Sequence, residues 1–198
     1  PQRAAGVHPR RALMAARLED TAEGEARRRK LREAIAYKIY EFDAHGVEMN
    51  QRYHSSAVVS DGSADRGFKE DPELYYQATT YPGARLPHVW IEQGTDKVST
   101  LDVCGHGRFT LLTSIGGGVW KDAAAAYTGK TGLDLAVVTI GPGCDYEDPF
   151  GEWATAREVN DSGCVLVRPD HHVAWRARDR VNDCTVALDL VMGKLLGV

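Results

Sequence analysis

The chain has 198 residues, of which 43% are hydrophobic and 26% are charged. This composition is ordinary for a folded protein with a sizeable core and unlike that of a disordered chain. The net charge of -4 offers no basic face for phosphate contacts, so we expect no nucleic acid partner. No apolar run approaches the ~18 residues that span a bilayer, and there is no secretory start, so we expect no membrane partner and a cytoplasmic location.

An amphipathic helix is predicted near the start of the chain. Apolar side chains recur there at helical spacing with charged residues between them, which is typical of a helix that buries one face. The apolar stripe consists of Leu31, Ile35, Ile39 and Phe42. We expect this helix over about 24–45, with Gly46 as its C-terminal cap.

The residues around this helix are less regular. Ala57-Val58-Val59 favours a short strand, and the stretch that follows, DGSADRGFKEDPEL, is rich in glycine, aspartate and charge. We therefore expect a linker over 60–84. Because the stretch from Pro1 has many charges and an irregular apolar pattern, we interpret it as the end of something longer.

After the linker the pattern changes to alternating strands and helices. Turn residues separate two predicted strands, and a third strand leads through three glycines into an alanine-rich segment that favours helix. The predicted strands are 87–91, 100–104, 108–113 and 133–140, and the predicted helices are 119–127 and 152–159. The last of these strands, LDLAVVTI, is a nearly continuous apolar run, which is typical of a central strand buried on both faces.

The stretch GCVLVRPDHHVAWRA, residues 163–177, gathers charged and imidazole side chains between two apolar alternations. Pro169-Asp170 is a strong turn signal, so we predict the tip of a hairpin rather than a catalytic or metal site. His171 follows the turn, where we expect a left-handed or bulged backbone, which His tolerates better than a β-branched residue. A last helix is predicted after Asn182 or Asp183, either of which can cap it.

From Phe109 onward the predicted order is strand, helix, strand, helix, strand, strand, helix. The last two strands form the hairpin, and the terminal helix packs back on the sheet. This is the order of a thioredoxin-like fold. The expected fold class is therefore α/β, with a central mixed sheet flanked by helices over residues 85–198, preceded by a helical tail.

The sequence lacks the residues that thiol redox chemistry, metal binding and phosphate binding need. Ser114 to Gly118 follow the first core strand, where a redox-active thioredoxin would carry a low-pKa cysteine. The four cysteines are widely spaced, so we expect reduced, mostly buried thiols. Adjacent His171 and His172 on a strand would point to opposite faces, which disfavours a shared metal. The three glycines match neither common phosphate-binding motif, so we interpret them as a closely packed turn.

The segment ATTYPGARLPHVW, residues 78–90, gathers Tyr81, Arg85 and His88 around two prolines and a glycine. It is either a binding loop or a stiff start of the folded region, in which the prolines fix the direction of the chain. The density of these three side chains makes them our candidates for docking to another domain.

Four stretches carry a family resemblance. They are EAIAYKIYEFDAHGVEMNQRYHSSAVV, DPELYYQATTYPGARLPHVWI, STLDVCGHGRFTLLTSIGG and GCVLVRPDHHVAWRA. Together they resemble the C-terminal third of the FAD-dependent phenol hydroxylases, a branch of the single-component flavoprotein aromatic hydroxylases, from about Glu23 to the C-terminus. The resemblance implies an enzyme that uses NADPH to reduce FAD and hydroxylates a phenol to a catechol.

The resemblance also implies where the catalytic parts lie. In the family, FAD is held by an N-terminal GxGxxG motif and a later GD motif, and this sequence contains neither. We therefore expect no catalytic, cofactor-binding or metal-binding residues in this chain. Residues 1–59 would be the remnant of the FAD and substrate region, and residues 85–198 an appended thioredoxin-like domain without CxxC that serves packing, docking or dimer contact.

The expected partners follow from the same resemblance. They are the N-terminal FAD and substrate domain, a phenolic substrate of the full enzyme, and a second copy in a homo-oligomer. The alternative is a free-standing, redox-inactive thioredoxin-like module that binds another protein through residues 81–90. What precedes Pro1 in the gene distinguishes the two hypotheses.

Overall fold

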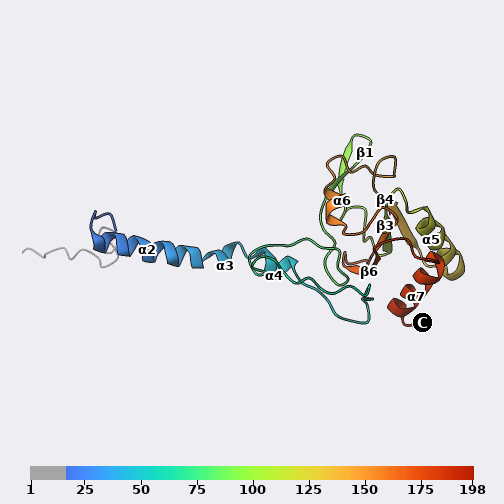
Figure 1. The fold of residues 1–198 in the computed structure, drawn as a ribbon, viewed down its shortest axis with the longest axis horizontal. Helices are drawn as coiled ribbons and strands as arrows, with labels where there is room; N and C mark the ends of the chain where they lie inside the picture. Colours follow the sequence, from blue (N-terminus) through green and yellow to red (C-terminus); the bar gives the residue numbers. More distant parts are fainter. Residues whose placement is uncertain (1–16) are drawn as a thin grey trace, which may run out of the picture. The chain divides into compact units, whose positions relative to one another are not determined.

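The computed structural model describes residues 17–198, which divide into two compact units between Ala44 and His45. The elements are helical up to Met49 and mixed from Trp90 onward (Figure 1). No helix within residues 17–198 is long and apolar enough to cross a membrane.

The first unit contains α2 (Ala22–Tyr37) and α3 (Ile39–Phe42) in place of the single helix expected over 24–45. The hydroxyl of Thr21 caps α2 by accepting a hydrogen bond from the Gly24 amide at 3.0 Å. At the other end the Lys38 amide donates to the Ile35 carbonyl at 3.0 Å, three residues back, which tightens the last turn and ends the helix.

Gly46 does not cap that helix. It lies inside α4 (His45–Met49), which begins the second unit. A Cβ atom at Gly46 would stand 2.0 Å from the Pro72 carbonyl oxygen, so a glycine is needed here for close backbone packing.

The second unit is built on a four-stranded mixed sheet with the order β4-β3-β5-β6. The strands are β3 (Phe109–Thr113), β4 (Leu135–Thr139), β5 (Cys164–Val167) and β6 (Val173–Ala177). β3 pairs in parallel with β4 and antiparallel with β5, and β5 forms a hairpin with β6. The predicted order of elements from Phe109 onward is confirmed.

Helices cover both faces of this sheet. They are α5 (Gly118–Thr131), α6 (Glu152–Ala156) and α7 (Cys184–Leu196). α5 and α7 lie together on one side, and α6 lies on the other (Figure 1). Leu111 of β3 belongs to the core with Trp120 of α5, whereas its neighbour Leu112 belongs to the core with Trp153 of α6. The strand period of two therefore fills two separate cores.

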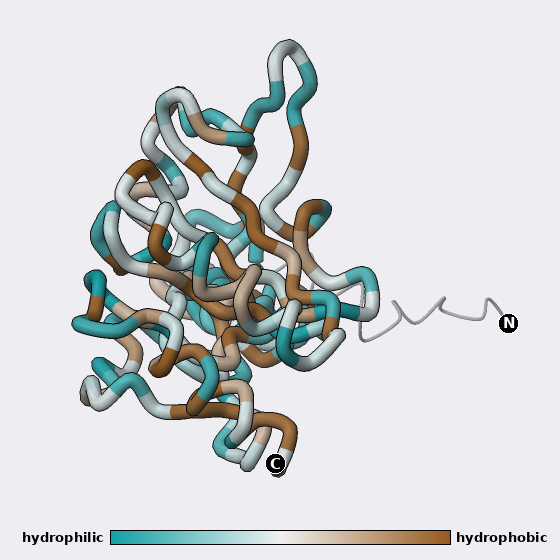
Figure 2. The backbone as a smooth tube through the Cα atoms, turned by 90° about the vertical axis from the view of Figure 1, so that its right-hand side faces the viewer, coloured by the Kyte–Doolittle hydropathy of each residue, from teal (hydrophilic) through white to brown (hydrophobic). Residues whose placement is uncertain are grey.

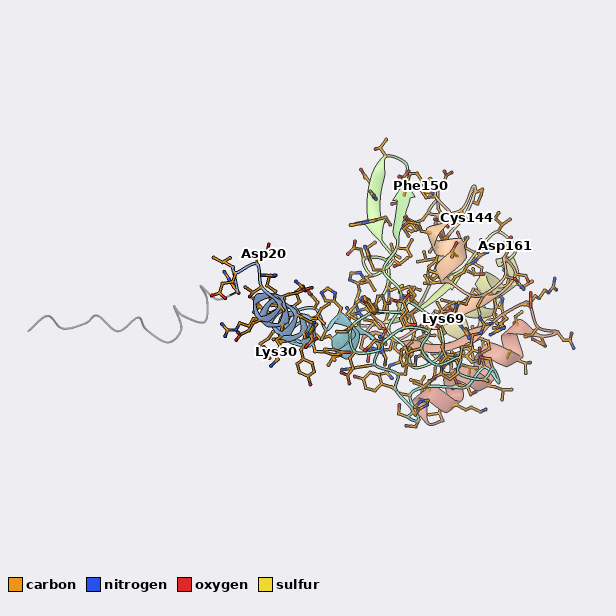
Figure 3. All side chains as sticks on the ribbon, turned by 60° about the vertical axis from the view of Figure 1, so that its left-hand side comes forward. Asp20, Lys30, Lys69, Cys144, Phe150 and Asp161 are labelled. Atoms are coloured by element: carbon orange, nitrogen blue, oxygen red, sulfur yellow. The ribbon has the colours of Figure 1, made fainter. Side chains whose placement is uncertain are left out.

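The colouring by hydropathy shows the consequence of this layering. Hydrophobic segments run through the interior of the folded unit, and hydrophilic segments occupy most of the outer loops (Figure 2). Side chains on those loops reach outward, as Phe150 does from the loop before α6 (Figure 3).

β4 is an edge strand, which corrects the expectation of a central one. It pairs only with β3 in the sheet. Its apolar run reflects cover on its two faces rather than strands on both sides: Leu135 packs into the α5 and α7 core, and Val138 into the α6 core. A run of apolar residues reports buried faces and says nothing about the number of neighbouring strands.

The first predicted pair of strands exists as a hairpin with shifted bounds. β1 (Trp90–Gln93) pairs antiparallel with β2 (Asp96–Ser99). The strand expected over 100–104 is absent because Thr100 ends the ladder: its amide donates to the Val89 carbonyl at 3.0 Å, and its hydroxyl donates to the Pro87 carbonyl at 2.6 Å. The chain then turns instead of extending.

Two irregular segments extend the sheet beyond β6. The Gly83 amide donates to the Val173 carbonyl and the Val173 amide to the Ala84 carbonyl, both at 2.8 Å. The Tyr53 amide donates in turn to the Gly83 carbonyl at 2.9 Å. Gly83 has φ 94°, and a Cβ there would lie 2.2 Å from the Tyr53 carbonyl oxygen, so only glycine permits this approach.

Residues 57–59 form no strand. They run irregularly beside β6, with the Val59 amide donating to the Ala174 carbonyl at 2.8 Å. One backbone bond of this kind holds the segment in place without a ladder. Other details of the sequence analysis are confirmed: His171 has φ 64°, in the left-handed region, and Asp183 caps the last helix.

We expect Asp183→Ala to lower the free energy of unfolding of the chain by about 1 kcal/mol. The Asp183 carboxylate accepts the hydrogen bond of the Val186 amide at 2.9 Å, and alanine leaves that amide without this partner. Urea unfolding measures the loss. Asn182→Ala is the matched control and should change stability little, and equal losses in the two variants would contradict the assignment of the cap.

Candidate functional site

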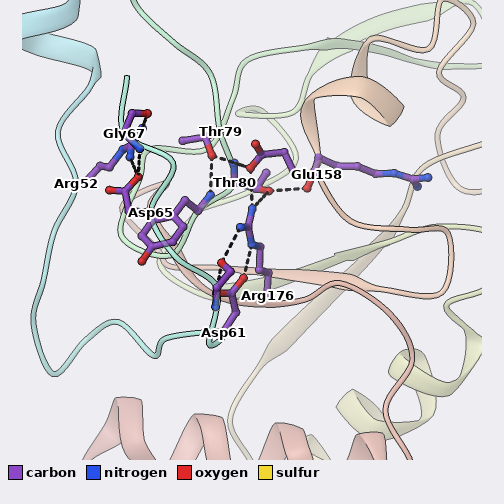
Figure 4. Close-up of polar contacts among 11 residues, drawn as sticks. Arg52, Asp61, Asp65, Gly67, Thr79, Thr80, Glu158 and Arg176 are labelled. Atoms are coloured by element: carbon purple, nitrogen blue, oxygen red, sulfur yellow. Dashed lines mark hydrogen bonds and ion pairs between the residues drawn. The ribbon is translucent and has the colours of Figure 1, made fainter. Parts of the chain in front are cut away.

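A buried arginine joins β6 to the irregular segment of residues 61–80. The side chain of Arg176 is 3% exposed. Its Nε donates to the Asp61 carboxylate at 2.7 Å, and its Nη1 donates to the Glu158 carboxylate at 2.7 Å (Figure 4). Nη1 also donates to the Thr80 hydroxyl at 3.0 Å, and Nη2 to the Ser63 hydroxyl at 3.3 Å. We call these five residues the Arg176 cluster.

The two carboxylates of the Arg176 cluster are held in their charged forms. Burial would raise the pKa of Asp61, but hydrogen bonds from Arg176 and Ser63, together with the Arg176 charge, lower it below its ordinary value. Burial likewise opposes ionisation of Glu158, and bonds from Thr79 and Arg176 lower its pKa. Two carboxylates around one guanidinium give the cluster a formal charge of -1.

Glu158 adopts a backbone conformation that favours glycine, with φ 53°. For a residue with a Cβ this costs roughly 1–2 kcal/mol. Its carboxylate accepts hydrogen bonds from the Thr79 hydroxyl at 2.7 Å and the Thr80 amide at 3.2 Å, in addition to the bond from Arg176. These bonds hold the strained residue in place.

A second ion pair stands beside the first. Arg52 pairs with Asp65, and its guanidinium carbon lies 4.2 Å from the centre of the Phe68 ring. The ring of Tyr81 is shared by both arginines, with its centre 5.9 Å from the guanidinium carbon of Arg52 and 5.7 Å from that of Arg176. Cation–π contacts of this kind contribute on the order of 1 kcal/mol each.

A cavity of about 300 Å³ opens between these groups. Its charged and aromatic lining consists of Arg52, Asp65, Arg66, Lys69, Glu70, Tyr81, Glu158 and Arg176. Because charges of both signs line it and the buried ones already pair with each other, the cavity is a poor match for a flat apolar ligand. The polar groups around the cavity hold residues 61–81 against β6.

The three residues predicted for docking lie in different surroundings. Tyr81 lines the cavity just described, and Arg85 lines a smaller one that has Arg52, Gln77 and Thr79 in common with it. His88 lines neither cavity. It is exposed, with its Nδ1 2.6 Å from the Ser99 hydroxyl and its ring 4.8 Å from the ring of Trp90. The structure therefore places Tyr81 and Arg85 at two adjoining cavities and His88 beside the β1–β2 hairpin.

Sequence reasoning missed the Arg176 cluster. Asp61 lies within the predicted linker, and Arg176 lies within the predicted hairpin, whose charges indicate an exposed tip. One signal was present: Arg176 stands in an otherwise apolar strand, VAWRA, where an inward charge requires a partner. The identity of that partner, 115 residues earlier, could not be predicted from spacing.

Three of the four cysteines are buried, and the His171 ring contacts a backbone carbonyl. Cys104, Cys164 and Cys184 are buried, and burial raises the pKa of Cys104 to about 12. Cys144 is half-buried in the loop after β4 (Figure 3). His171 has its Nε2 3.0 Å from the Leu101 carbonyl. Within residues 17–198, no group of His, Cys, Asp and Glu side chains is arranged to hold a metal ion.

The glycine turn before α5 is packed shut. A Cβ at Gly117 would lie 1.9 Å from the Thr113 hydroxyl oxygen, and one at Gly116 would lie 3.0 Å from the Asp161 carbonyl oxygen. The interpretation as a closely packed turn is therefore confirmed for Gly116 and Gly117, whereas the Cβ position of Gly118 is open.

Most of the chain matches a known family. A family model described as the C-terminal part of aromatic-ring hydroxylases matches residues 79–197, which include the sheet, its helices and most of the Arg176 cluster.

The chain belongs to the aromatic-ring hydroxylases.

Curated relatives of this family share high identity with the chain. It is 50% identical over 186 residues to 2,4-dichlorophenol 6-monooxygenase of Cupriavidus pinatubonensis, covering 93% of this chain and 31% of that protein. It is 45% identical over 181 residues to phenol 2-monooxygenase of a Pseudomonas species, covering 91% of this chain and 30% of that protein. The chain thus spans about a third of the length of these relatives.

A solved structure shares the fold in detail. The flavin-dependent monooxygenase PieE, whose structure is a complex with FAD and substrate, superimposes with a TM-score of 0.87 at 49% identity. The match covers 97% of this chain and 33% of PieE. This aromatic-ring hydroxylase chain is therefore a mixed α/β structure like the C-terminal parts of flavin hydroxylases.

We expect Arg176→Met to lower the free energy of unfolding by about 3–5 kcal/mol, because it leaves two carboxylates without their cation, and Asp61 is only 5% exposed. Urea unfolding followed by circular dichroism measures this. The matched control, Arg108→Met, breaks the exposed pair with Asp134 and should cost less than about 1 kcal/mol. Similar losses in both variants would contradict the role of the Arg176 cluster.

Stability should also depend on pH on the acid side. Because the pKa values of Asp61 and Glu158 are lower in the folded chain than in the unfolded one, their contribution is fully present above the unfolded carboxyl pKa of roughly 4. It is lost as the pH falls through the lowered folded values. The urea midpoint between about pH 7 and about pH 3 measures the loss. Arg176→Met should flatten the profile, and a midpoint that rises on acidification would refute this account.

Proposed function

We propose that this chain is the C-terminal part of an FAD- and NADPH-dependent monooxygenase that hydroxylates a phenol, such as 2,4-dichlorophenol, to a catechol. The observation that carries the proposal is the identity of 50% to a 2,4-dichlorophenol 6-monooxygenase, which extends over 93% of this chain. The identity of 45% to a phenol 2-monooxygenase supports the same class of substrate.

The described residues do not fit a flavin site of their own. The Thr113 side chain fills the space beside Gly117, and the cavity beside Arg176 is lined by charges of both signs. In this class of enzyme the flavin, when bound, supplies the oxygen chemistry, and the protein supplies orientation and exclusion of water. We therefore assign this chain a role in packing, docking or dimer contact rather than in catalysis.

The strand order supports a thioredoxin-like classification for residues 85–198. A parallel pair, β3 and β4, is followed by an antiparallel hairpin, β5 and β6, with the order β4-β3-β5-β6. Ser114 follows β3, where thiol redox chemistry would need a cysteine. Burial raises the pKa of Cys104 and Cys164, which further disfavours thiolate chemistry.

The proposed domain organisation assigns residues 1–59 to the end of the FAD and substrate region and residues 60–84 to the connection. That connection is tied to β6 through Asp61, Ser63 and Thr80. A connection held firmly against β6 would fix the position of one domain relative to the other, which is consistent with a docking role.

The test uses the longer gene product. We expect it to bind about one FAD per chain and to oxidise NADPH in a phenol-dependent reaction that yields a catechol, measured by flavin absorbance, NADPH consumption and product chromatography. Cys144→Ser should keep full turnover, because no thiol takes part. The 198-residue chain, mixed with FAD and dialysed, should be colourless.

Two results would overturn the proposal. One is a longer product that binds no flavin. The other is a gene that encodes only these 198 residues, which would favour the free-standing protein-interaction module. A flavin band retained by the 198-residue chain alone would contradict the assignment of the cofactor to another region.

A further inference from the structure

Arg85 has a cation that no described residue neutralises. Its side chain is half-buried, and its Nε is enclosed without a hydrogen-bond acceptor in residues 17–198. Every other arginine of the second unit that is not exposed has a carboxylate partner. These pairs are Arg52 with Asp65, Arg157 with Asp161, Arg168 with Asp170 and Arg176 with Asp61. The Arg85 guanidinium therefore has no carboxylate partner within residues 17–198, and a carboxylate supplied from outside the chain would neutralise it.

A second polar group beside Arg85 also has no partner. The Tyr76 hydroxyl is buried and makes no hydrogen bond within residues 17–198. Tyr76 and Arg85 line the same small cavity, together with Asn50. Burial raises the pKa of Tyr76, which keeps the phenol in its neutral form, able to donate a hydrogen bond. Two unpartnered donors thus lie side by side.

The cavity between them has no room for a water molecule. Water therefore does not satisfy these donors from the inside. Only the Nε of the Arg85 guanidinium is fully enclosed, so the two terminal nitrogens remain reachable from the surface. These two nitrogens can donate two parallel hydrogen bonds to one carboxylate.

The backbone holds Arg85 in a fixed place. Arg85 and His172 form a bridge between strands, and the next amide, that of Leu86, donates to the His171 carbonyl at 2.8 Å. The His172 ring contacts the exposed ring of Tyr53 edge-on, with 4.8 Å between ring centres. An arginine with an anchored backbone, bordered by segments that carry exposed aromatic side chains, has the composition of a protein interface.

Asn50 ties the neighbouring segment to the same region. Its Nδ2 donates to the Tyr75 carbonyl at 2.7 Å, and its Oδ1 accepts from the Gln77 amide at 2.9 Å. Tyr75 is 49% exposed. The exposed rings of Tyr53 and Tyr75 therefore belong to the two segments that border Arg85.

We propose that Arg85 is a docking point for a carboxylate side chain of the flavin-binding region in the longer protein. The inference rests on the proposed function, because the chain spans 31% of its curated relative and the partner would belong to the remainder. A carboxylate would neutralise the guanidinium through its terminal nitrogens. The adjoining aromatic side chains would be covered by the same contact.

The test converts the docking contact into a covalent bond. In the longer protein, Arg85→Lys places an amine at this position, and a water-soluble carbodiimide activates carboxylates. The lysine amine then displaces the activating group, so that an amide forms and the carbodiimide leaves as its urea. We expect mass spectrometry of the digest to show residue 85 joined to an Asp or Glu outside these 198 residues.

Matched variants define the outcomes. Arg108→Lys should cross-link to Asp134, its partner at 3.1 Å, and shows that the reagent works. Arg85→Gln should give no cross-link at residue 85. A cross-link from residue 85 to an acid within this chain, or none while Arg108→Lys reacts, would overturn the proposal.

A second measurement needs no variant. An arginine-selective dicarbonyl should modify Arg85 readily in the 198-residue chain and several-fold more slowly in the longer protein, with exposed Arg178 as the internal reference. Equal rates in both proteins would overturn the docking contact. Equal rates that slow on addition of acetate would point instead to a free small carboxylate. Cross-linking to a region that binds no flavin would leave the docking point intact and refute the proposed function.

Discussion

A guanidinium inside the edge of a sheet is the constraint on which the second unit depends. Arg176 stands on β6 among apolar neighbours, and transfer of a charge to such a place is costly unless carboxylates and hydroxyls surround it. Asp61, Ser63, Thr80 and Glu158 provide that surrounding. The segment that brings three of them has few buried apolar residues, so polar contacts rather than hydrophobic packing determine its path. A pairing so specific in geometry allows few alternative arrangements of that segment.

Arg176 and Arg85 lie near the same edge of the sheet but differ in their partners. All three nitrogens of Arg176 have partners within the chain, which makes its contacts internal and independent of any neighbour. Arg85 forms an isolated backbone bridge with His172, just before β6, and its Nε has no hydrogen-bond partner within residues 17–198. In the proposed arrangement, Arg176 stabilises the connection within the chain and Arg85 serves recognition.

Local signals account for what the sequence could predict. The turn at Pro169-Asp170, the left-handed His171 and the cap at Asp183 each depend on residues within a few positions of one another. The order of elements from Phe109 onward followed from periodicity, because period two and period 3.6 are visible in single segments.

Contacts between residues far apart in the sequence could not be predicted. The position of β4 at the edge depends on which side of β3 receives the crossover and which receives the hairpin, and periodicity is silent on that choice. The strand expected after residue 99 fails because the Thr100 hydroxyl bonds back to Pro87. The ion pair of Arg176 with Asp61 joins residues 115 positions apart, and no pattern within either segment indicates the other.

The irregular pairing outside β6 has a consequence for assembly. A sheet ordinarily ends in a row of free amides and carbonyls, which invites a strand from another molecule. Here the Gly83 to Leu86 segment pairs with residues 171–173 at the start of β6, and the Tyr53 amide donates in turn to the Gly83 carbonyl. The chain itself therefore covers the start of this edge. A protein that binds at this part of the edge meets side chains rather than free backbone amides and carbonyls. Its selectivity there depends on which side chains are present.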